Sequence, residues 1–434
     1  MREATKRLLV CIGLVSALVT FINSYDYQVF RNWVIAANLV GILDIYKASV
    51  VLGHPFRVVY PPLAPLLFIA SASLVVALYP AYILLAYPPL VMRAVLKVPL
   101  VLSVLVGYEV FRRRVNDEAA RLLLYNILLI LLLQVYVFDI PASIAAGLAL
   151  IMLDTPVVAA LLLSTATLLK QNFVLLAIPV LLYYLHRGSK RDALIFTLTY
   201  VASSVAVLLP FALINGLNVM MNYMLFFHAS RPPQGPTLWT LLLVETGYNA
   251  QLASRLSGLW VVVYAILSLY ALYKLRSKLG TTDGVLALAA ALLIALLVSS
   301  KVVNPQYFAW PLPLLAILTS RGILGRERVR DYTLAGLIAI IYPVLAPFAA
   351  AVIGAPVYLE EEARWLSPEE TRRLVVDAAP ELAPLLLSVF RENPILYTLA
   401  SLVYHSWPLI LPVLSVTYTV LLARVYISLL QQDR

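Results

Sequence analysis

The stretch GVLALAAALLIALLVSS, residues 284–300, decides the fold class of this chain. It carries no charged side chain, and a helix of about 20 apolar residues, or somewhat fewer where neighbours cover its ends, spans the hydrocarbon core of a membrane. The whole chain continues this pattern: 62% of its 434 residues are hydrophobic and 12% are charged, against roughly 45–50% and 25% in soluble domains. The sequence therefore predicts an integral membrane protein that crosses the bilayer many times.

The apolar runs predict an all-α, polytopic fold with about twelve transmembrane helices. The expected crossings are 8–23, 94–111, 122–138, 142–153, 157–169, 172–185, 193–213, 256–273, 284–300, 307–320, 332–352 and 398–423. Residues 63–91 are also apolar, but Pro80, Pro88 and Pro89 interrupt them, and proline breaks the helical hydrogen-bond ladder. We expect a juxtamembrane or re-entrant hairpin there; two further crossings would raise the count to about fourteen.

The positive charges predict the orientation. Lys and Arg outnumber Asp and Glu by 32 to 22, and they cluster in predicted loops at 112–114, 187–191, 274–278 and 321–330. Because basic loops face the cytoplasm, we expect both termini to be cytoplasmic, with the first crossing kept as an anchor. This orientation accounts for the net charge of +10 without a nucleic-acid partner.

Two classes of chemistry are excluded by missing motifs. The single cysteine, Cys11, rules out an internal disulfide and a cysteine metal cluster. The sequence contains no Gly-rich loop followed by Lys-Ser or Lys-Thr, which argues against a nucleotide-driven pump. The residues suited to chemistry lie instead in predicted extracytoplasmic loops, of which 24–62, 214–255 and 353–397 are the longest.

The first of these loops offers a candidate general base. Asp26 follows the end of the first crossing, and Arg31 and Trp33 come next on an expected short interfacial helix. A carboxylate that is partly desolvated beside aromatic rings is a stronger base. The alternative is that Asp26 only caps an interfacial helix. The loop ends in Tyr60-Pro61-Pro62, a rigid elbow.

Two short loops carry opposite charges. Asp139 lies at the outer end of one crossing, and Lys170 lies at the outer end of another. A lysine between apolar residues is costly in lipid unless it snorkels or has an anionic partner. A phosphate is one such partner, since the Lys ammonium is a compact phosphate binder.

Two later loops add candidate ligands for phosphate and sugar. Arginine suits phosphate recognition, amides and phenols bind hydroxyls, and an indole offers a flat face for a sugar ring. The residues concerned are His228, Arg231, Gln234 and Trp239 in one loop, and Lys301, Asn304, Gln306 and Tyr307 in the other.

The order of these motifs resembles that of a known family. Asp26-Tyr27-x-x-x-Arg31-x-Trp33, then Tyr60-Pro61-Pro62-Leu63, then Met92-Arg93 opening a crossing, is similar to the first third of the GT-C glycosyltransferases. The nearest likeness is to the asparagine-linked-glycosylation glucosyltransferases of the endoplasmic reticulum. Asn304-Pro305-Gln306-Tyr307 resembles a late motif of polyprenyl-phosphate-sugar-dependent transferases.

This resemblance implies a fold, an activity and a set of partners. The fold would comprise a catalytic module at 1–190 and a C-terminal module at 191–434. The enzyme would move a hexose, such as mannose or glucose, from a polyprenyl (dolichyl) monophosphate to a hydroxyl of a lipid-linked or other glycan, with inversion. The site would face the extracytoplasmic side of the cell membrane or of the endoplasmic reticulum, in contact with membrane lipid.

The resemblance also implies residue roles. Asp26 matches the catalytic base, and Lys170 would neutralise the departing lipid phosphate. Arg231 and Lys301 are second candidates for the phosphate on chemistry alone. With Asp26 and Asp139 as the only external carboxylates in the candidate motifs, a divalent metal is not favoured, and no other cofactor is expected.

Two other classes of function stay open. A secondary transporter, or a flippase for lipid-linked sugars, would favour polar residues at the membrane midplane and an internal repeat, neither of which the sequence shows clearly. A non-catalytic assembly subunit is the third alternative. Transfer activity with a polyprenyl-phosphate sugar separates the first hypothesis from both.

The polar segment 353–397 predicts a covering element. Ser367-Pro368-Glu369-Glu370 reads as a helix start, with Ser as cap and Pro in the first turn. Apolar residues follow, with Pro380 and Pro384 expected to break the run. We expect a kinked segment that lies over the catalytic mouth as a lid; a plain linker is the alternative.

Overall fold

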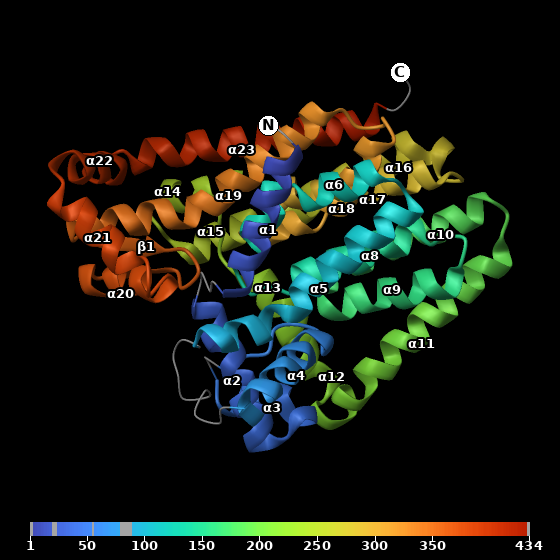
Figure 1. Ribbon diagram of the computed structural model, residues 1–434, viewed down its shortest axis with the longest axis horizontal. Helices are drawn as coiled ribbons and strands as arrows, with labels where there is room; N and C mark the ends of the chain where they lie inside the picture. Colours follow the sequence, from blue (N-terminus) through green and yellow to red (C-terminus); the bar gives the residue numbers. More distant parts are fainter. Residues whose placement is uncertain (1–2, 20–23, 54–55, 79–88, 432–434) are drawn as a thin grey trace.

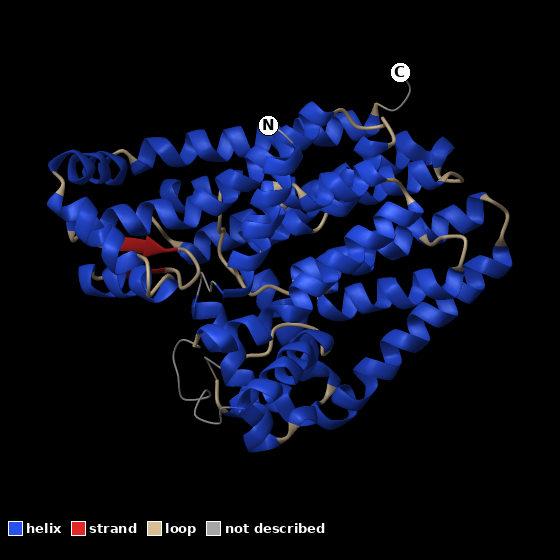
Figure 2. Ribbon diagram, in the orientation of Figure 1, coloured by secondary structure: helices blue, strands red, loops and turns tan. Residues whose placement is uncertain are grey.

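The computed structural model describes residues 3–19, 24–53, 56–78 and 89–431. Figure 1 and Figure 2 show an almost entirely helical molecule in which the only strands of the described residues form one short hairpin. The all-α prediction is thus confirmed except for this hairpin, which the sequence reading did not anticipate.

Short connections join successive helices and strands. Their bounds are α1 Glu3–Val19, α2 Ser24–Val40, η1 Ile42–Asp44, α3 Ile45–Val51, α4 Leu63–Leu78, α5 Leu90–Arg114, α6 Asp117–Leu124, α7 Ile127–Leu132, α8 Asp139–Ile151, α9 Pro156–Leu169, η3 Gln171–Leu176, α10 Ala177–His186, α11 Lys190–Asn215, α12 Leu217–Met221, η4 Asn222–Phe226, α13 Phe227–Ser230, η5 Leu238–Thr240, α14 Leu241–Glu245, α15 Ala250–Leu256, η6 Ser257–Leu259, α16 Trp260–Leu275, η7 Arg276–Lys278, α17 Thr282–Ser299, η8 Pro305–Ala309, α18 Leu312–Ser320, α19 Arg326–Ile353, β1 Val357–Leu359, β2 Arg364–Leu366, α20 Pro368–Ala378, α21 Ala383–Glu392, α22 Pro394–His405 and α23 Trp407–Leu430.

Six helical segments of the described residues are long and apolar enough to cross a membrane. They are Met92–Arg114, Lys190–Asn215, Ala250–Lys278, Thr282–Ser299, Arg326–Ile353 and Trp407–Leu430. The chain is therefore an integral membrane protein by the length and composition of its helices. Each segment overlaps an expected crossing. The other six crossings, the side on which each terminus lies and the boundary between the two modules stay predictions.

Several expected crossings are broken in the structure: 172–185 is divided between η3 and α10, 307–320 is divided between η8 and α18, and two others are broken by caps or turns. The run 122–138 is divided between α6 and α7 because the Asn126 side chain accepts the Leu128 amide at 2.9 Å and starts a new helix. The run 398–423 is divided at Ser406, where α22 ends and α23 begins with Pro408 in its first turn. Within the apolar segment 63–91, α4 covers Leu63–Leu78 and α5 begins at Leu90. Residues 79–88 lie outside the described part of the chain, so the expected hairpin stays a prediction.

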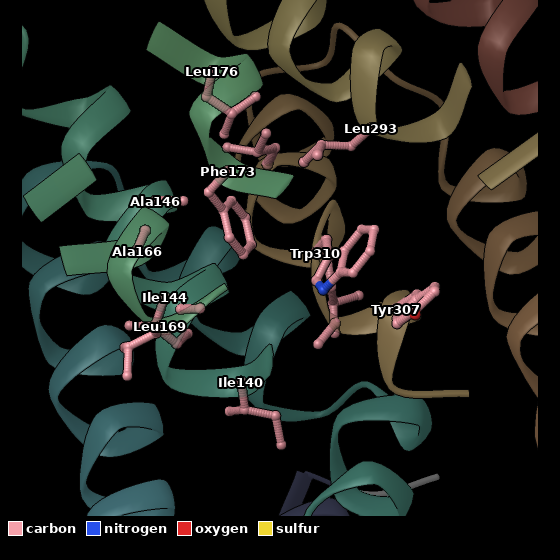
Figure 3. Close-up of a cluster of buried hydrophobic side chains, with 14 of the residues drawn as sticks. Ile140, Ile144, Ala146, Ala166, Leu169, Phe173, Leu176, Leu293, Tyr307 and Trp310 are labelled. Carbon is pink, nitrogen blue, oxygen red and sulfur yellow. The ribbon is translucent and has the colours of Figure 1, made fainter. Parts of the chain in front are cut away.

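Helix α17 lies at the centre of the core. Its apolar window is 83% buried, and small residues such as Ala287, Ala291 and Ala295 let neighbouring helices approach its backbone. It packs against α16, α18, α23, α8 and α10. The buried cluster around it draws on both predicted modules, and Figure 3 shows the part in which Leu293 lies near Phe173 and Leu176.

The segment 353–397 forms the end of the molecule that holds β1, α20 and α21 in Figure 1. The predicted cap at Ser367 is confirmed, because Ser367 Oγ accepts the Glu370 amide and the Glu370 carboxylate accepts the Ser367 amide. Pro380 lies between α20 and α21 as expected. The prediction for Pro384 is wrong: it lies in the first turn of α21, where a missing amide proton costs nothing.

This segment is attached to the N-terminal part of the chain. Arg93, at the start of α5, is buried, and its guanidinium donates to both carboxylate oxygens of Glu381 at 3.0 and 2.5 Å. Helix α20 also contacts α2, the helix that carries Asp26. The predicted lid segment and the predicted base thus belong to elements that touch.

Candidate functional site

The site is built around Lys170, which follows α9. Its side chain is 3% exposed, and its Nζ lies 3.3 Å from Asp139 Oδ1 at the start of α8. Helices α8 and α9 form an antiparallel hairpin, so the first residue of one and the residue after the other meet at the same end. Burial is the largest single effect and lowers the pKa of Lys170, but the Asp139 carboxylate and the Tyr60 and Tyr307 phenols together raise it by more, so the pKa lies above its ordinary value.

Aromatic rings enclose this ion pair. The Lys170 ammonium lies 4.5 Å from the ring centroid of Tyr60 and 5.2 Å from that of Tyr307. Trp310 donates its indole N–H to Asp139 Oδ1 at 2.6 Å. Figure 3 shows Trp310 between Phe173 and Tyr307, and the Tyr307 ring stacks on it at 4.3 Å.

Four predicted site residues therefore meet here: Tyr60, Asp139, Lys170 and Tyr307. Trp310 was missed by the sequence reading. Its signal was an indole at the predicted outer end of a crossing, where a buried N–H needs an acceptor. The pair and its rings form a desolvated, neutral unit rather than a free cation.

A second lysine, Lys301, shares a cavity with this unit. The cavity measures about 180 Å³, and Lys170, Lys301, Tyr307 and Trp310 line it together with both apolar and polar residues. The remaining lining residues are Gln171, Asn172, Met224, Leu225, Ala229, Trp260, Leu296, Leu297, Ser300 and Val302. The volume is below the roughly 300–1,000 Å³ of drug-sized ligand pockets, so in this conformation the cavity suits a small headgroup.

Lys301 differs from Lys170 in its partners. Its side chain is buried, and its Nζ donates to Ser254 Oγ at 3.1 Å. No carboxylate of the described residues forms a salt bridge with it. Burial lowers the pKa of Lys301 because it disfavours the charged form. An anion bound in the cavity would favour the charged form and raise this pKa again.

The backbone around Lys301 pairs with the loop that carries Gln234. The Gln234 amide donates to Lys301 O at 2.8 Å, and the Val303 amide donates to Gln234 O at 3.0 Å. The next residue, Gly235, has φ +82°, and an added Cβ would lie 2.2 Å from Val303 O. Only glycine fits this close approach, so the loop and Lys301 hold a fixed register.

Glu360 fastens the hairpin β1–β2 to the same loop. Its carboxylate accepts the Tyr342 hydroxyl at 2.5 Å and the Gly235 amide at 2.9 Å. Burial raises the pKa of Glu360 from 4.5 to about 7, more than these two hydrogen bonds lower it. Beside it, Arg231 lies 3.4 Å from Glu361 and hydrogen-bonds to Gln234. Sequence reasoning missed Glu360, whose only signal was its place in an acidic triplet.

The other predicted residues have separate surroundings. Trp33 is fully buried, donates to Arg57 O at 3.0 Å and stacks near Phe138, so its ring does not line the cavity. Trp239 donates to Ser299 O at 2.6 Å. Arg31, Asn304 and Gln306 are partly exposed, and their roles as substrate contacts stay predictions.

Two candidates cannot be placed by their side chains. The backbone of Asp26 belongs to α2 and that of His228 to α13, but both side chains lie outside the described residues. Their assigned roles remain predictions. Among the described residues no three His, Cys, Asp or Glu side chains gather as a metal site.

Lys97 is a further buried charge that the sequence reading passed over. It lies one turn after Arg93 on α5, and its Nζ donates to Leu133 O at 2.8 Å and to Gln134 O at 2.6 Å. These carbonyls follow the end of α7, where a cation is favourable. Lys97 thus has a structural role in joining α5 to that helix end.

The comparisons with known proteins add one finding. The sequence matches no protein-family model and no curated protein. Among solved structures, the chain is similar to a crystal structure of ArnT from Cupriavidus metallidurans bound to undecaprenyl phosphate, with 14% identity and a TM-score of 0.43, over 98% of this chain and 76% of that one.

Proposed function

We propose that the protein is an integral-membrane glycosyltransferase that uses a polyprenyl (dolichyl) monophosphate hexose as its donor. The observation that carries the proposal is Lys301, a buried ammonium that lines a cavity and has no carboxylate partner among the described residues. A buried charge is costly unless it is paired, so the cavity favours an anion. The apolar lining from Met224, Trp260 and Leu296 suits the hydrocarbon attached to such an anion.

The charge balance of the cavity favours a phosphodiester. Lys170 and Asp139 neutralise each other, and Lys301 adds one positive charge. A hexose joined to a lipid through phosphate carries one negative charge, which matches. When the sugar leaves, the phosphate gains further negative charge, and two nearby ammonium groups stabilise that developing charge.

The transfer step then follows from the proposed roles. An acceptor hydroxyl oxygen attacks the anomeric carbon as the bond from that carbon to the phosphate oxygen breaks. The hydroxyl proton passes to Asp26, and the electron pair of the broken bond stays on the polyprenyl phosphate, held at Lys301 and Lys170. Attack opposite the phosphate inverts the anomeric centre. The acceptor is a hydroxyl of a lipid-linked or other extracytoplasmic glycan.

A flippase or secondary transporter is the second candidate, because the same cavity would hold a lipid phosphate without breaking a bond. The experiment that separates them uses purified protein in nanodiscs, a radiolabelled short-chain polyprenyl-phosphate mannose or glucose, and a lipid-linked oligosaccharide as acceptor. We expect release of polyprenyl phosphate and appearance of a labelled glycan. Proteoliposomes that move the intact donor across the bilayer without this cleavage would support the flippase instead.

Lys301→Met tests the phosphate site, since it removes the charge and keeps a similar length. Loss of one such charge partner is expected to slow transfer by about 10²–10³-fold and to weaken donor binding. Lys47→Met is the matched control, because Lys47 is half exposed and pairs with Asp44 in α3 and η1, away from the cavity lining. Equal effects of the two variants would overturn the assignment.

A further inference from the structure

Three aromatic rings gather on the hairpin β1–β2. Tyr358 and Trp365 lie opposite each other in its antiparallel register, with ring centroids 5.6 Å apart. Tyr248, from the turn after α14, contacts both rings at 4.7 and 5.1 Å. We call Tyr248, Tyr358 and Trp365 the aromatic platform. Its outermost member, Trp365, is 53% exposed, although a large aromatic is usually covered in a folded chain.

The backbone of Tyr248 is held in an unfavourable conformation to complete this platform. Its φ is +63°, a region that bulky residues rarely enter and that Gly or Asn would adopt more easily. The turn is fixed by a 2.6 Å hydrogen bond from the Tyr248 amide to Leu243 O. Strained residues of this kind cluster at binding and catalytic sites, and here the strain brings a third ring onto the hairpin.

Polar groups surround the platform. Tyr358 Oη is buried and has no hydrogen-bond partner among the described residues, so its donor capacity is not used within them. The hairpin turn carries exposed Glu361 and Glu362, and Arg364 pairs with Glu362 at 2.7 Å. Flat rings next to carboxylates and a guanidinium are suited to a sugar, whose C–H face lies on a ring and whose hydroxyls need acceptors and donors.

The platform is joined to the lysine cavity by short links. Glu360 follows β1 directly and accepts the Gly235 amide, and the adjacent Gln234 pairs with the backbone at Lys301 and Val303. A glycan bound to the platform would therefore contact a hairpin that is hydrogen-bonded to the loops around Lys301. This continuity connects the platform to the proposed site.

We propose that Tyr248, Tyr358 and Trp365 form a binding subsite for a hexose-containing glycan. Its role as the acceptor subsite rests on the proposed function, but sugar binding itself does not. The competing occupant is the membrane interface, where Trp and Tyr also gather. The carboxylates Glu361 and Glu362 beside the platform favour the glycan, because a carboxylate gains nothing from contact with lipid tails.

The test is saturation-transfer difference NMR on the full-length protein in nanodiscs, with mannotriose and maltotriose as probes. We expect saturation transfer from the protein to the ring C–H protons of at least one trisaccharide. Trp365→Ala should weaken the interaction about tenfold. Tyr248→Asn is the second variant, because Asn tolerates the left-handed backbone, and it should weaken binding while the turn keeps its shape. Tyr397→Ala, which removes an exposed aromatic of α22 outside the platform, should bind as wild type.

Two further results bear on the proposal. If the wild-type protein shows no saturation transfer to either trisaccharide, the proposal of a glycan subsite is overturned. Strong quenching of the Trp365 fluorescence, defined as the difference from Trp365→Phe, by lipids with brominated chains also overturns it and makes the platform an interfacial anchor. Lys301→Met separates the two proposals: it should slow glycosyl transfer by about 10²–10³-fold and keep sugar binding, so a failure of one proposal does not imply a failure of the other.

Discussion

Lys170 Nζ lies 3.3 Å from Asp139 Oδ1, and both side chains are buried at the same end of the α8–α9 hairpin. This pair changes how a lysine variant has to be interpreted. Removing one partner of a buried pair leaves an uncompensated charge, which typically costs 3–5 kcal/mol. A loss of activity on removing Lys170 alone would therefore mix catalysis with stability.

The first prediction separates these two effects by a double-mutant cycle. Lys170→Met and Asp139→Asn should each lower the free energy of unfolding, by about 3–5 kcal/mol where the remaining charge stays buried. The double variant should recover much of that stability, because no charge is left unpaired. Thermal unfolding in nanodiscs measures the coupling. Additive losses would show that the two groups do not interact in the protein.

The same cycle defines the role of Lys170 in transfer. In the double variant the fold is restored but the ammonium is absent, so donor affinity and transfer rate should both stay below those of wild type. Wild-type values in that variant would leave Lys301 as the sole phosphate ligand.

The Asp139–Lys170 contact could have been predicted from the sequence, whereas other parts of the site could not. Two antiparallel helices joined by a short turn bring the first residue of one beside the residue after the other, and both residues were already candidates. The link from Glu360 through Gly235 to Lys301 depends on three loops far apart in the chain. No local pattern specifies which amide a glutamate in an acidic triplet will contact, and the Gly235 approach to Val303 is visible only once the backbones pair.

The fold was predictable to a similar extent. Hydrophobic length alone located the six long helices. It could not show that the Asn126 side chain would cap a new helix inside an apolar run, because a cap and a polar residue within a crossing look alike in sequence. The hairpin β1–β2 was missed because strands of three residues are too short to show an alternating pattern.

A second prediction concerns the proposed base. Asp26→Asn should abolish most glycosyl transfer, since a positioned base contributes typically 10²–10⁴-fold. Donor binding and thermal stability should change little, because the amide has nearly the same shape. Turnover with labelled donor, together with donor affinity, provides the test. Near-wild-type turnover would remove Asp26 from the mechanism.

A third prediction follows from the pKa of Glu360, which is raised from 4.5 to about 7 in the folded protein. The folded state then binds this proton more tightly than the unfolded state. Its stabilising contribution is complete below about pH 4.5 and is lost as the pH rises through about 7. The phenols of Tyr248 and Tyr358 are also near it, but burial raises the pKa of both, so neither titrates in this window.

Glu360→Gln should remove this dependence, because the amide stays neutral at every pH. The unfolding temperature of the variant minus that of wild type should therefore increase from pH 5 to pH 8, while all other titrating groups cancel in the difference. Glu361→Gln is the matched control, since Glu361 is exposed on the same turn. A flat difference for Glu360→Gln would mean that this carboxyl titrates near its ordinary value.

The last prediction tests the lid. The segment 353–397 is fastened at one point by Glu360 and at another by the contact of Glu381 with the buried Arg93. If this segment excludes water from the proposed site, weakening one attachment should let water compete with the acceptor hydroxyl for the anomeric carbon. Glu381→Gln keeps the shape of the side chain and removes its charge, so it should raise the ratio of donor hydrolysis to glycosyl transfer. Glu392→Gln, at an exposed position of α21 in the same segment, should leave that ratio unchanged.

Replacing residues 360–392 by a Gly/Ser linker should raise the ratio of donor hydrolysis to glycosyl transfer further, because both attachments are then lost. If the ratio and the acceptor affinity stay constant in Glu381→Gln and in the linker variant, the segment only tethers α22 and α23 to the rest of the molecule.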